Sequence, residues 1–316
     1  SYAELKSRVE NLLVVCDKRL LSWVTETLFA QDSAFVKASV EGCGILSKDG
    51  FTAFLVAENS LESLQFVDSV CIPHLVKKYG VRYDKIVIKT VGAPRERTEQ
   101  LLDTAKRLSA DRLAYNHKRE YESDCIEIFY DSTTPRMLTD DVLRIFADGL
   151  EEFIYALEDK SLEEQLVDML KVRGKKIAVA ESFTAGGVGK RIVSVAGASE
   201  VYFEGLNTYN ELSKIKRLGV QEYTLKTFGA VSDETAYQMA AGLIATGDVD
   251  VAIATTGIAG PKSDSMEFPV GLAYIAIGTR EKVYVYRYKF DGNRKEITEK
   301  AINHALFLAY RQLKDI

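Results

Sequence analysis

The hydrophobic pattern of the second half of the chain alternates between helical and extended periods. A capping-box pattern at residues 161–164 opens a series of apolar positions at helical spacing: Leu162, Leu166, Val167 and Leu170. An apolar run at 176–180 predicts a buried strand, and small hydroxylated residues with two glycines interrupt the pattern at 182–187. Because an amphipathic segment follows at 188–195, we interpret this stretch as a strand, a turn that carries Ser182, and a helix.

The rest of this half continues the alternation. The pattern predicts two further strands at 202–208 and 250–255 and an apolar hairpin at 270–290. It also predicts three helices, at 210–218, 232–245 and 294–313. Strands and helices intermixed in this order indicate one α/β domain over residues 161–316, in which helices flank a mixed sheet.

The first half of the chain divides into two smaller parts. Residues 81–160 predict an α+β unit with strands at 84–91 and 124–130 and helices at 95–108 and 140–157. Residues 1–80 predict a short α/β segment with strands at 12–16 and 52–56 and a helix at 61–79. Since 80 residues bury only a small core, we expect this segment to pack on the middle unit or on another subunit.

Composition narrows the class of protein. The chain has 316 residues, 47% of them hydrophobic, and a formal net charge of −5. No apolar run approaches the ~20 residues that span a membrane, and the first residues show no secretory pattern. We therefore expect a cytoplasmic protein without a membrane partner. The net charge supplies no basic field for nucleic acid.

The cysteines and histidines predict no metal site. No C-x-x-C pair occurs, and we expect reduced, mostly buried thiols at Cys16, Cys43, Cys71 and Cys125. The three histidines are far apart in sequence: His74, His117 and His304. A serine nucleophile in the second half would therefore need a base other than histidine.

The turn at Ser182 is the strongest candidate for chemistry. A strand–turn–helix exposes a side-chain oxygen and leaves the first backbone N–H groups of the helix free. Those groups and the helix dipole favour an anion or a developing oxyanion. The stretch can hold a nucleophile or a phosphate, and Ser182 is equally suited to capping the helix.

Four motifs in order give the second half a family resemblance. They are E-S-F-T-A-G at 181–186, T-Y at 208–209 with a lysine at 214, G-A-V-S at 229–232, and T-G-I-A-G-P at 256–261 followed by P-V-G at 269–271. Together they resemble the CinA family, whose C-terminal domain is a nicotinamide mononucleotide deamidase.

The resemblance implies a Ser/Lys amidohydrolase of pyridine-nucleotide salvage that needs no cofactor or metal. Ser182 would be the nucleophile and Lys214 the general base, and Tyr209 would hydrogen-bond one of them. Backbone N–H groups at 182–187 are candidate oxyanion donors. The substrate would be a small mononucleotide, and family members lead us to expect a homodimer. Considered alone, Lys214 is also compatible with a solvated helix position, and Tyr209 with a half-buried strand aromatic.

Further positions are candidates for binding the substrate: Glu181, Thr184, Gly186, Gly187, Thr256, Gly257, Ala259, Gly260 and Arg294. The glycines let a phosphate or ribose approach the backbone, although tight turns explain them as well. We favour Glu181 as a support of the turn, while Thr184 suits a helix cap or the orientation of Ser182 or substrate. Arg294 suits a phosphate, but Asn293 and Thr298 replace an aspartate and a second arginine of the family pattern.

The first half also resembles parts of longer CinA proteins. Residues 81–160 resemble their KH-type domain, and residues 1–80 resemble a shortened molybdopterin-binding-like domain without its motifs. We therefore do not expect an ADP-ribose pyrophosphatase there. Nor do we expect nucleic-acid binding, because residues 92–95 do not supply the G-x-x-G loop of a KH domain. The alternative function is a catalytically silent CinA-like binding or regulatory protein linked to competence or DNA damage.

Overall fold

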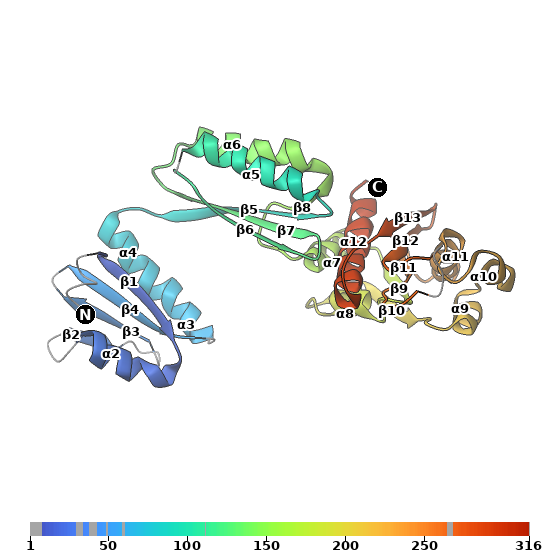
Figure 1. Ribbon diagram of the computed structural model, residues 1–316, viewed down its shortest axis with the longest axis horizontal. Coiled ribbons are helices and arrows are strands. Elements are labelled where there is room, and N and C mark those ends of the chain that lie inside the picture. The colour runs from blue at the N-terminus through green and yellow to red at the C-terminus, as the bar shows by residue number, and fades with distance from the viewer. Residues whose placement is uncertain are drawn as a thin grey trace. The chain divides into compact units, whose positions relative to one another are not determined.

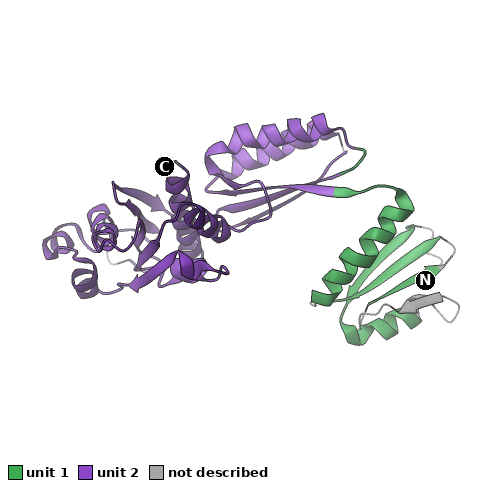
Figure 2. Cartoon of the chain, turned by 180° about the vertical axis from the view of Figure 1, so that it is seen from behind, with its two compact units in different colours: residues 1–83, 131–133 green, residues 84–130, 134–316 purple. Residues whose placement is uncertain are grey.

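The computed structural model describes residues 8–29, 34–37, 43–48, 50–58, 61–110, 112–263 and 268–315. The chain forms two compact units, residues 1–83 with 131–133 and residues 84–130 with 134–316 (Figures 1 and 2). In the described residues the first unit is built on one sheet and the second on two. None of the described helices combines the length and apolar character needed to cross a membrane.

The first unit is a four-stranded sheet with helices packed against it. The strand order is β1-β4-β3-β2, and the strands are β1 (Asn11–Cys16), β2 (Ala34–Lys37), β3 (Gly44–Lys48) and β4 (Phe51–Ala57). A short 3-10 turn (Lys18–Leu20) leads into α2 (Leu21–Phe29). β1 runs parallel to β4, and the other pairs are antiparallel. Apolar clusters around Leu55 and around Phe54 show that the unit has a core of its own.

The single helix that we predicted at 61–79 is interrupted. The structure has α3 (Leu61–Phe66), a π-helical segment η3 (Val67–Cys71) and α4 (Ile72–Tyr79). Pro73 lies in the first turn of α4. Because proline has no N–H to donate and its ring clashes with the carbonyl four residues earlier, it disfavours a regular α-helix here, and the π-helical segment directly precedes α4.

The middle sheet has helices on one face. Its strand order is β6-β7-β5-β8, and the strands are β5 (Tyr83–Val91), β6 (Ala114–Glu120), β7 (Ser123–Asp131) and β8 (Ile154–Ala156). The helices α5 (Arg95–Ser109) and α6 (Arg136–Leu150) bury their apolar faces with Ile126 and Ile128 of β7. Strand β6 was not predicted, because His117 and Arg119 occupy its inward positions, where both bond the buried Asp124.

The helix predicted at 140–157 was wrong at both ends. α6 begins at Arg136 and ends at Leu150, and a 3-10 turn η4 (Glu151–Phe153) leads into β8. β8 pairs antiparallel with β5 and carries Ile154 and Tyr155, a β-branched and an aromatic residue that suit strands. The 3-10 turn kept apolar residues at helix-like spacing, which concealed the change from helix to strand.

The C-terminal sheet confirms the predicted α/β class with a mixed sheet. Its strand order is β10-β9-β11-β12-β13, with β9 (Ile177–Glu181), β10 (Tyr202–Asn207), β11 (Val251–Gly257), β12 (Leu272–Thr279) and β13 (Val283–Lys289). The first three strands in that order are parallel, and β12 and β13 are antiparallel. The sheet alternates larger residues such as Ile177 on one face with alanines such as Ala178 on the other.

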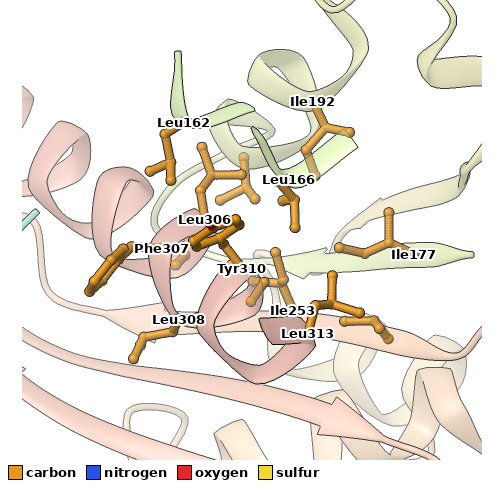
Figure 3. Packing of buried hydrophobic residues seen from close by; sticks show 14 of the residues in the cluster. Leu162, Leu166, Ile177, Ile192, Ile253, Leu306, Phe307, Leu308, Tyr310 and Leu313 are labelled. Atoms are coloured by element: carbon orange, nitrogen blue, oxygen red, sulfur yellow. The ribbon is translucent and has the colours of Figure 1, made fainter. Parts of the chain in front are cut away.

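Helices cover both faces of this sheet. They are α7 (Leu162–Val172), α8 (Gly187–Val193), α9 (Glu211–Leu218), α10 (Glu222–Phe228), α11 (Asp233–Ile244) and α12 (Arg294–Asp315), with a 3-10 turn η5 (Ala198–Glu200). Figure 3 shows Leu166, Ile253 and Leu306 in the core on the side of α7 and α12. All ten residues 301–310 of α12 are buried. A helix that is buried all round has neighbours on every side. Helix α10, which was not predicted, lies with α11 on the opposite, alanine-rich face of the sheet.

Candidate active site

The carboxyl ends of the three parallel strands meet at one edge of the C-terminal sheet. Ser182 follows β9, Thr208 follows β10, and Thr255 lies near the end of β11. The main chain joins them, because the Ser182 amide donates to the Thr255 carbonyl at 3.0 Å and the Thr208 amide to the Glu181 carbonyl at 2.8 Å. Open α/β sheets place ligands at this edge.

Glu181 holds the turn that carries Ser182. Its carboxylate accepts hydrogen bonds from the Thr184 hydroxyl at 2.7 Å and from the amides of Gly186, Val188 and Gly189 at 3.0, 3.1 and 2.8 Å. The side chain is 1% exposed. Every one of these donors belongs to the turn or to the start of α8, so Glu181 caps the helix, and its buried carboxylate lies behind the turn rather than open to a ligand.

This cap corrects our expectation about the oxyanion donors. The amides of Gly186, Val188 and Gly189 are taken by Glu181, and those of Ala185 and Gly187 bond carbonyls within the turn. In the part of the chain that the structure describes, the amides of Phe183 and Thr184 have no acceptor. They are the backbone donors left next to the serine, each worth roughly 3 kcal/mol to an oxyanion.

Two glycines of the turn serve its geometry. Gly186 has φ +92° and follows Ala185 at φ +52°, so the chain passes twice through the left-handed region. A Cβ on Gly187 would lie 2.4 Å from Cδ1 of Ile302 on α12. Gly186 therefore permits the left-handed backbone conformation of the turn, and Gly187 lets α12 approach the start of α8.

Ser182 and Lys214 lie in direct contact. Lys214 Nζ is 3.1 Å from Ser182 Oγ and donates to the Thr208 carbonyl at 2.6 Å. Lys214 sits in α9, a helix capped by the Asn210 side chain. The lysine side chain is 1% exposed and Ser182 is 9% exposed, so the pair is shielded from water.

Burial lowers the proton affinity of the lysine. Loss of hydration lowers the pKa of Lys214 to about 8, against a small opposing effect of the Glu211 charge. No carboxylate among the described residues forms an ion pair with Nζ. A neutral amine at this place would still donate to the Thr208 carbonyl, and its lone pair could accept the hydrogen of the Ser182 hydroxyl. Lys214 is thus a buried amine in hydrogen-bond reach of a serine hydroxyl.

Threonines lie at the ends of strands β10 and β11 and in the turn after β9. Thr184 Oγ1 lies 2.7 Å from Thr255 Oγ1, and Thr256 Oγ1 donates to the Ala230 carbonyl at 2.6 Å. Among the described residues, Thr208 Oγ1 is one of two buried side-chain polar atoms without a hydrogen-bond partner. Thr208 lies in one of the four sequence motifs but was assigned no role, and Thr255 was not singled out; the available signal was a hydroxylated residue at the end of each parallel strand.

Tyr209 is not part of a strand. It lies in the loop after β10 and is 66% exposed, so the half-buried strand aromatic was wrong. Among the described residues, no hydrogen bond joins Tyr209 to Ser182 or Lys214. Its proposed hydrogen bond to the nucleophile or base would require movement of the loop.

The loop after β11 is joined to the last helix. Arg294, the first residue of α12, donates to the Gly260 carbonyl at 2.7 Å. Ala259 packs in one apolar cluster with Phe183, which follows the serine. The structure thus joins Arg294 to Gly260 and packs Ala259 with Phe183, and a Cβ on Gly257 would lie 3.0 Å from Cε1 of Phe183. Asn293 caps α12, because its Oδ1 accepts from the amides of Lys295 and Glu296.

We predict that Glu181→Gln destabilises the protein. A glutamine would place an NH2 group against a buried amide donor, and an unsatisfied buried donor costs roughly 1–3 kcal/mol. Thermal unfolding should show a Tm lowered by several degrees, together with lost protection of the 182–189 amides. Glu200→Gln, at a carboxylate that is 68% exposed and pairs with Lys171, is the matched control. An unchanged Tm in Glu181→Gln would contradict the capping role.

The fold and the site define an α/β protein with a buried serine–lysine pair at the carboxyl edge of its sheet. Residues 159–313 match the family model of the CinA C-terminal domain. A competence-damage inducible protein of Thermoanaerobacter pseudethanolicus is 31% identical over 286 residues, which cover 87% of this chain and 67% of that protein. The chain belongs to the CinA family.

Other relatives match in the same way. A competence-damage inducible protein of Caldicellulosiruptor saccharolyticus is 35% identical over 265 residues, 83% of this chain and 64% of the relative. A CinA-like protein of Kosmotoga olearia is 43% identical over 164 residues, which are 40% of its length. A crystal structure of the competence/damage inducible protein CihA from Agrobacterium tumefaciens, 35% identical, covers 51% of this chain and 99% of that one, with a TM-score of 0.47. The matched segments therefore span 64% of the Caldicellulosiruptor protein and 40% of the Kosmotoga protein.

Proposed function

We propose that the chain is an amidohydrolase that converts nicotinamide mononucleotide to nicotinic acid mononucleotide and ammonia. The observation that carries the proposal is the contact of Ser182 Oγ with a buried lysine amine whose pKa is lowered to about 8. A serine hydroxyl needs a neutral base in hydrogen-bond reach, and a desolvated lysine is one. Membership of the CinA family supports this reaction class.

The residues suggest a two-stage reaction. In the first stage Lys214 takes the Ser182 proton while Oγ bonds to the carboxamide carbon, and the carbonyl oxygen becomes an oxyanion facing the amides of Phe183 and Thr184. The C–N bond then breaks, and Lys214 returns the proton to the departing nitrogen, which leaves as ammonia. In the second stage Lys214 activates a water, which hydrolyses the acyl-serine and releases the acid.

The proposed substrate also has a phosphate to hold. Arg294 and the loop at 257–260 are the candidate contacts, because a guanidinium pairs well with phosphate and the loop contains two glycines. Arg294 is exposed, so its remaining N–H groups are open to a ligand. Thr298 bonds the carbonyls of Arg294 and Lys295 within α12 and adds no positive charge.

The test is release of ammonia and of nicotinic acid mononucleotide by the purified chain. Nicotinamide and nicotinamide riboside serve as comparison substrates, and a Ser182→Ala protein purified in parallel reports the background of contaminating amidases. We expect turnover of the mononucleotide above both comparison substrates. A folded protein with no turnover would reject the proposal and leave the catalytically silent binding protein as the alternative.

A further inference from the structure

The tip of the β6–β7 hairpin has an uncommon composition. Tyr121 and Glu122 have φ of +49° and +61°, the two successive left-handed residues of a tight hairpin turn. Such positions favour glycine or asparagine, since other side chains are strained there. The Glu122 carbonyl accepts from the Gly92 amide at 2.8 Å. A turn that keeps two large side chains at these positions suggests that the side chains themselves have a use.

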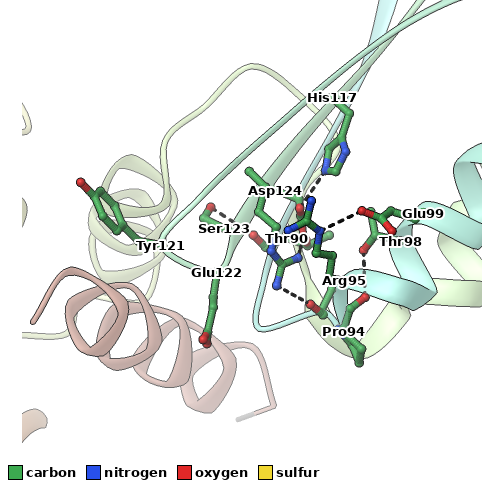
Figure 4. Close-up of polar contacts among 12 residues, drawn as sticks. Thr90, Pro94, Arg95, Thr98, Glu99, His117, Tyr121, Glu122, Ser123 and Asp124 are labelled. Carbon is green, nitrogen blue, oxygen red and sulfur yellow. Dashed lines mark hydrogen bonds and ion pairs between the residues drawn. The ribbon is translucent and has the colours of Figure 1, made fainter. Parts of the chain in front are cut away.

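The Glu122 side chain contacts two residues of helix α12. Its carboxylate lies 2.9 Å from His304 Nε2 and 3.3 Å from Lys300 Nζ, two residues one helical turn apart. Burial raises the pKa of Glu122, but the hydrogen bond to His304 and the Lys300 charge outweigh it, and the pKa is lowered. Figure 4 shows Glu122 at the hairpin tip beside the helix. Tyr121 adds a main-chain contact, since its carbonyl accepts from Asn303 Nδ2 at 3.0 Å.

His304 is held from further sides. Its ring is 7% exposed and lies 4.6 Å from the Tyr288 ring and 5.2 Å from the Phe290 ring, centroid to centroid. A Cβ on Gly92 would come within 2.8 Å of its Cε1. The imidazole is therefore fixed between the middle sheet and strand β13, and Glu122 meets a rigid partner.

Other residues of the same helix reach the candidate active site. Ile297 and Ala301 share an apolar cluster with Phe183 and Ala259, and Ile302 packs against Gly187. The first residue of the helix bonds the Gly260 carbonyl, as described above. Helix α12 thus contacts both the Ser182 turn and the loop at 257–260. These contacts lie at residues 294–302 of the helix, and the hairpin tip contacts residues 300–304.

A second connection runs through Asn303. Its Oδ1 accepts from Arg191 Nη1 at 3.1 Å, and Arg191 also pairs with Glu163 of α7 at 2.6 Å. Arg191 belongs to α8, the helix that begins at the Ser182 turn. The amide that holds the Tyr121 carbonyl therefore also holds the helix of the proposed nucleophile.

We propose that Glu122, at the tip of the middle sheet, is a positioning residue for the Ser182 site. By fixing α12, it holds the Ser182 turn and the loop at 257–260 in one arrangement, so the middle sheet completes the site. The kinetic part of this inference rests on the proposed amidohydrolase function.

The first test uses no substrate. Amide hydrogen exchange is measured on the whole chain for wild type, Glu122→Ala and Glu122→Gln, with Glu120→Ala as control, since the Glu120 side chain is 62% exposed and pairs with Lys118. We expect faster exchange at 182–193 and 257–263 in Glu122→Ala, an intermediate rate in Glu122→Gln, and wild-type rates in Glu120→Ala. Unchanged exchange in both Glu122 variants would overturn the proposal. Should the alanine variant fail to fold, the glutamine variant alone decides.

The second test separates positioning from general stability. We expect Glu122→Ala to raise the KM for nicotinamide mononucleotide about 3- to 10-fold, because the loop at 257–260 shifts, and to lower kcat as well, because the Ser182 turn shifts, with partial rescue of both in Glu122→Gln. A lower Tm with unchanged KM and exchange would make the contact merely structural and would overturn the inference. If wild type does not turn over this substrate, the proposed function fails, and the exchange experiment still decides the role of Glu122.

Discussion

Replacing Ser182 with alanine is expected to reduce ammonia release from nicotinamide mononucleotide by at least about 10³-fold, because nucleophile removal in serine hydrolases costs that much or more. The fold should survive, since among the described residues the serine hydroxyl accepts one hydrogen bond, from Lys214 Nζ, while the Ser182 amide still donates to the Thr255 carbonyl. The measurement is steady-state ammonia release, with circular dichroism as a check on folding.

Ser194→Ala is the matched control for this variant. Ser194 is an exposed serine at the other end of α8, where its hydroxyl bonds the Arg191 carbonyl. It should keep wild-type activity. Mass analysis of wild type quenched during turnover should find the acyl group on the peptide that contains Ser182. Activity that persists in Ser182→Ala would place the nucleophile elsewhere and reject the mechanism.

Replacing Lys214 with methionine should separate activity from stability. Methionine fills the same buried space with an unbranched chain but cannot accept a proton, so we expect activity to fall by roughly 10²- to 10⁴-fold. In the wild type the neutral amine is the active form, and its pKa is about 8. The wild-type kcat/KM should therefore rise about tenfold between pH 7 and pH 9, and the residual activity of the variant should lose this rise.

The same change should alter how the stability of the fold depends on pH. The pKa of Lys214 falls from 10.5 to about 8 on burial, so between these values the unfolded chain binds more protons and stability rises with pH. Below about pH 8 the folded protein bears the whole cost, at most roughly 3 kcal/mol. Removing the amine abolishes this cost but leaves the Thr208 carbonyl without its donor, so the Tm of the variant relative to that of wild type should be higher at pH 7 than at pH 10.

Lys216→Met, at an exposed lysine of the same helix, should change neither activity nor its pH profile. Loss of activity in both lysine variants would point to the helix rather than to the amine. A Lys214→Met protein with wild-type turnover would exclude the lysine as the base.

Sequence patterns predicted the C-terminal α/β layer well and the smaller parts less well. The strand at 176–180 and the helix from Ser232 were predictable because buried strands are continuously apolar and helix caps are local. Strand β6 was missed because its inward side chains are charged or polar and are neutralised by Asp124, which lies on another strand. The end of α6 was missed because pairing of β8 with β5 is a tertiary effect.

The candidate site was predictable in its parts rather than in its geometry. Ser182 stood out as a local turn, but only the family resemblance linked it to Lys214, 32 residues away. The capping by Glu181 was favoured beforehand, yet its extent was not, because a carboxylate that accepts four donors depends on the path of the following turn. The contact of Arg294 with Gly260 depends on packing between distant segments.

The buried Glu181 carboxylate has a consequence for release of the product. In the proposed reaction a neutral amide enters and an acid leaves, so a negative charge is created beside Ser182. The start of α8 would ordinarily attract such an anion, but Glu181 already occupies its amides and is itself a carboxylate. If the proposed reaction holds, the helix amides that would ordinarily retain a carboxylate are already taken, and we therefore expect weak inhibition by the acid product.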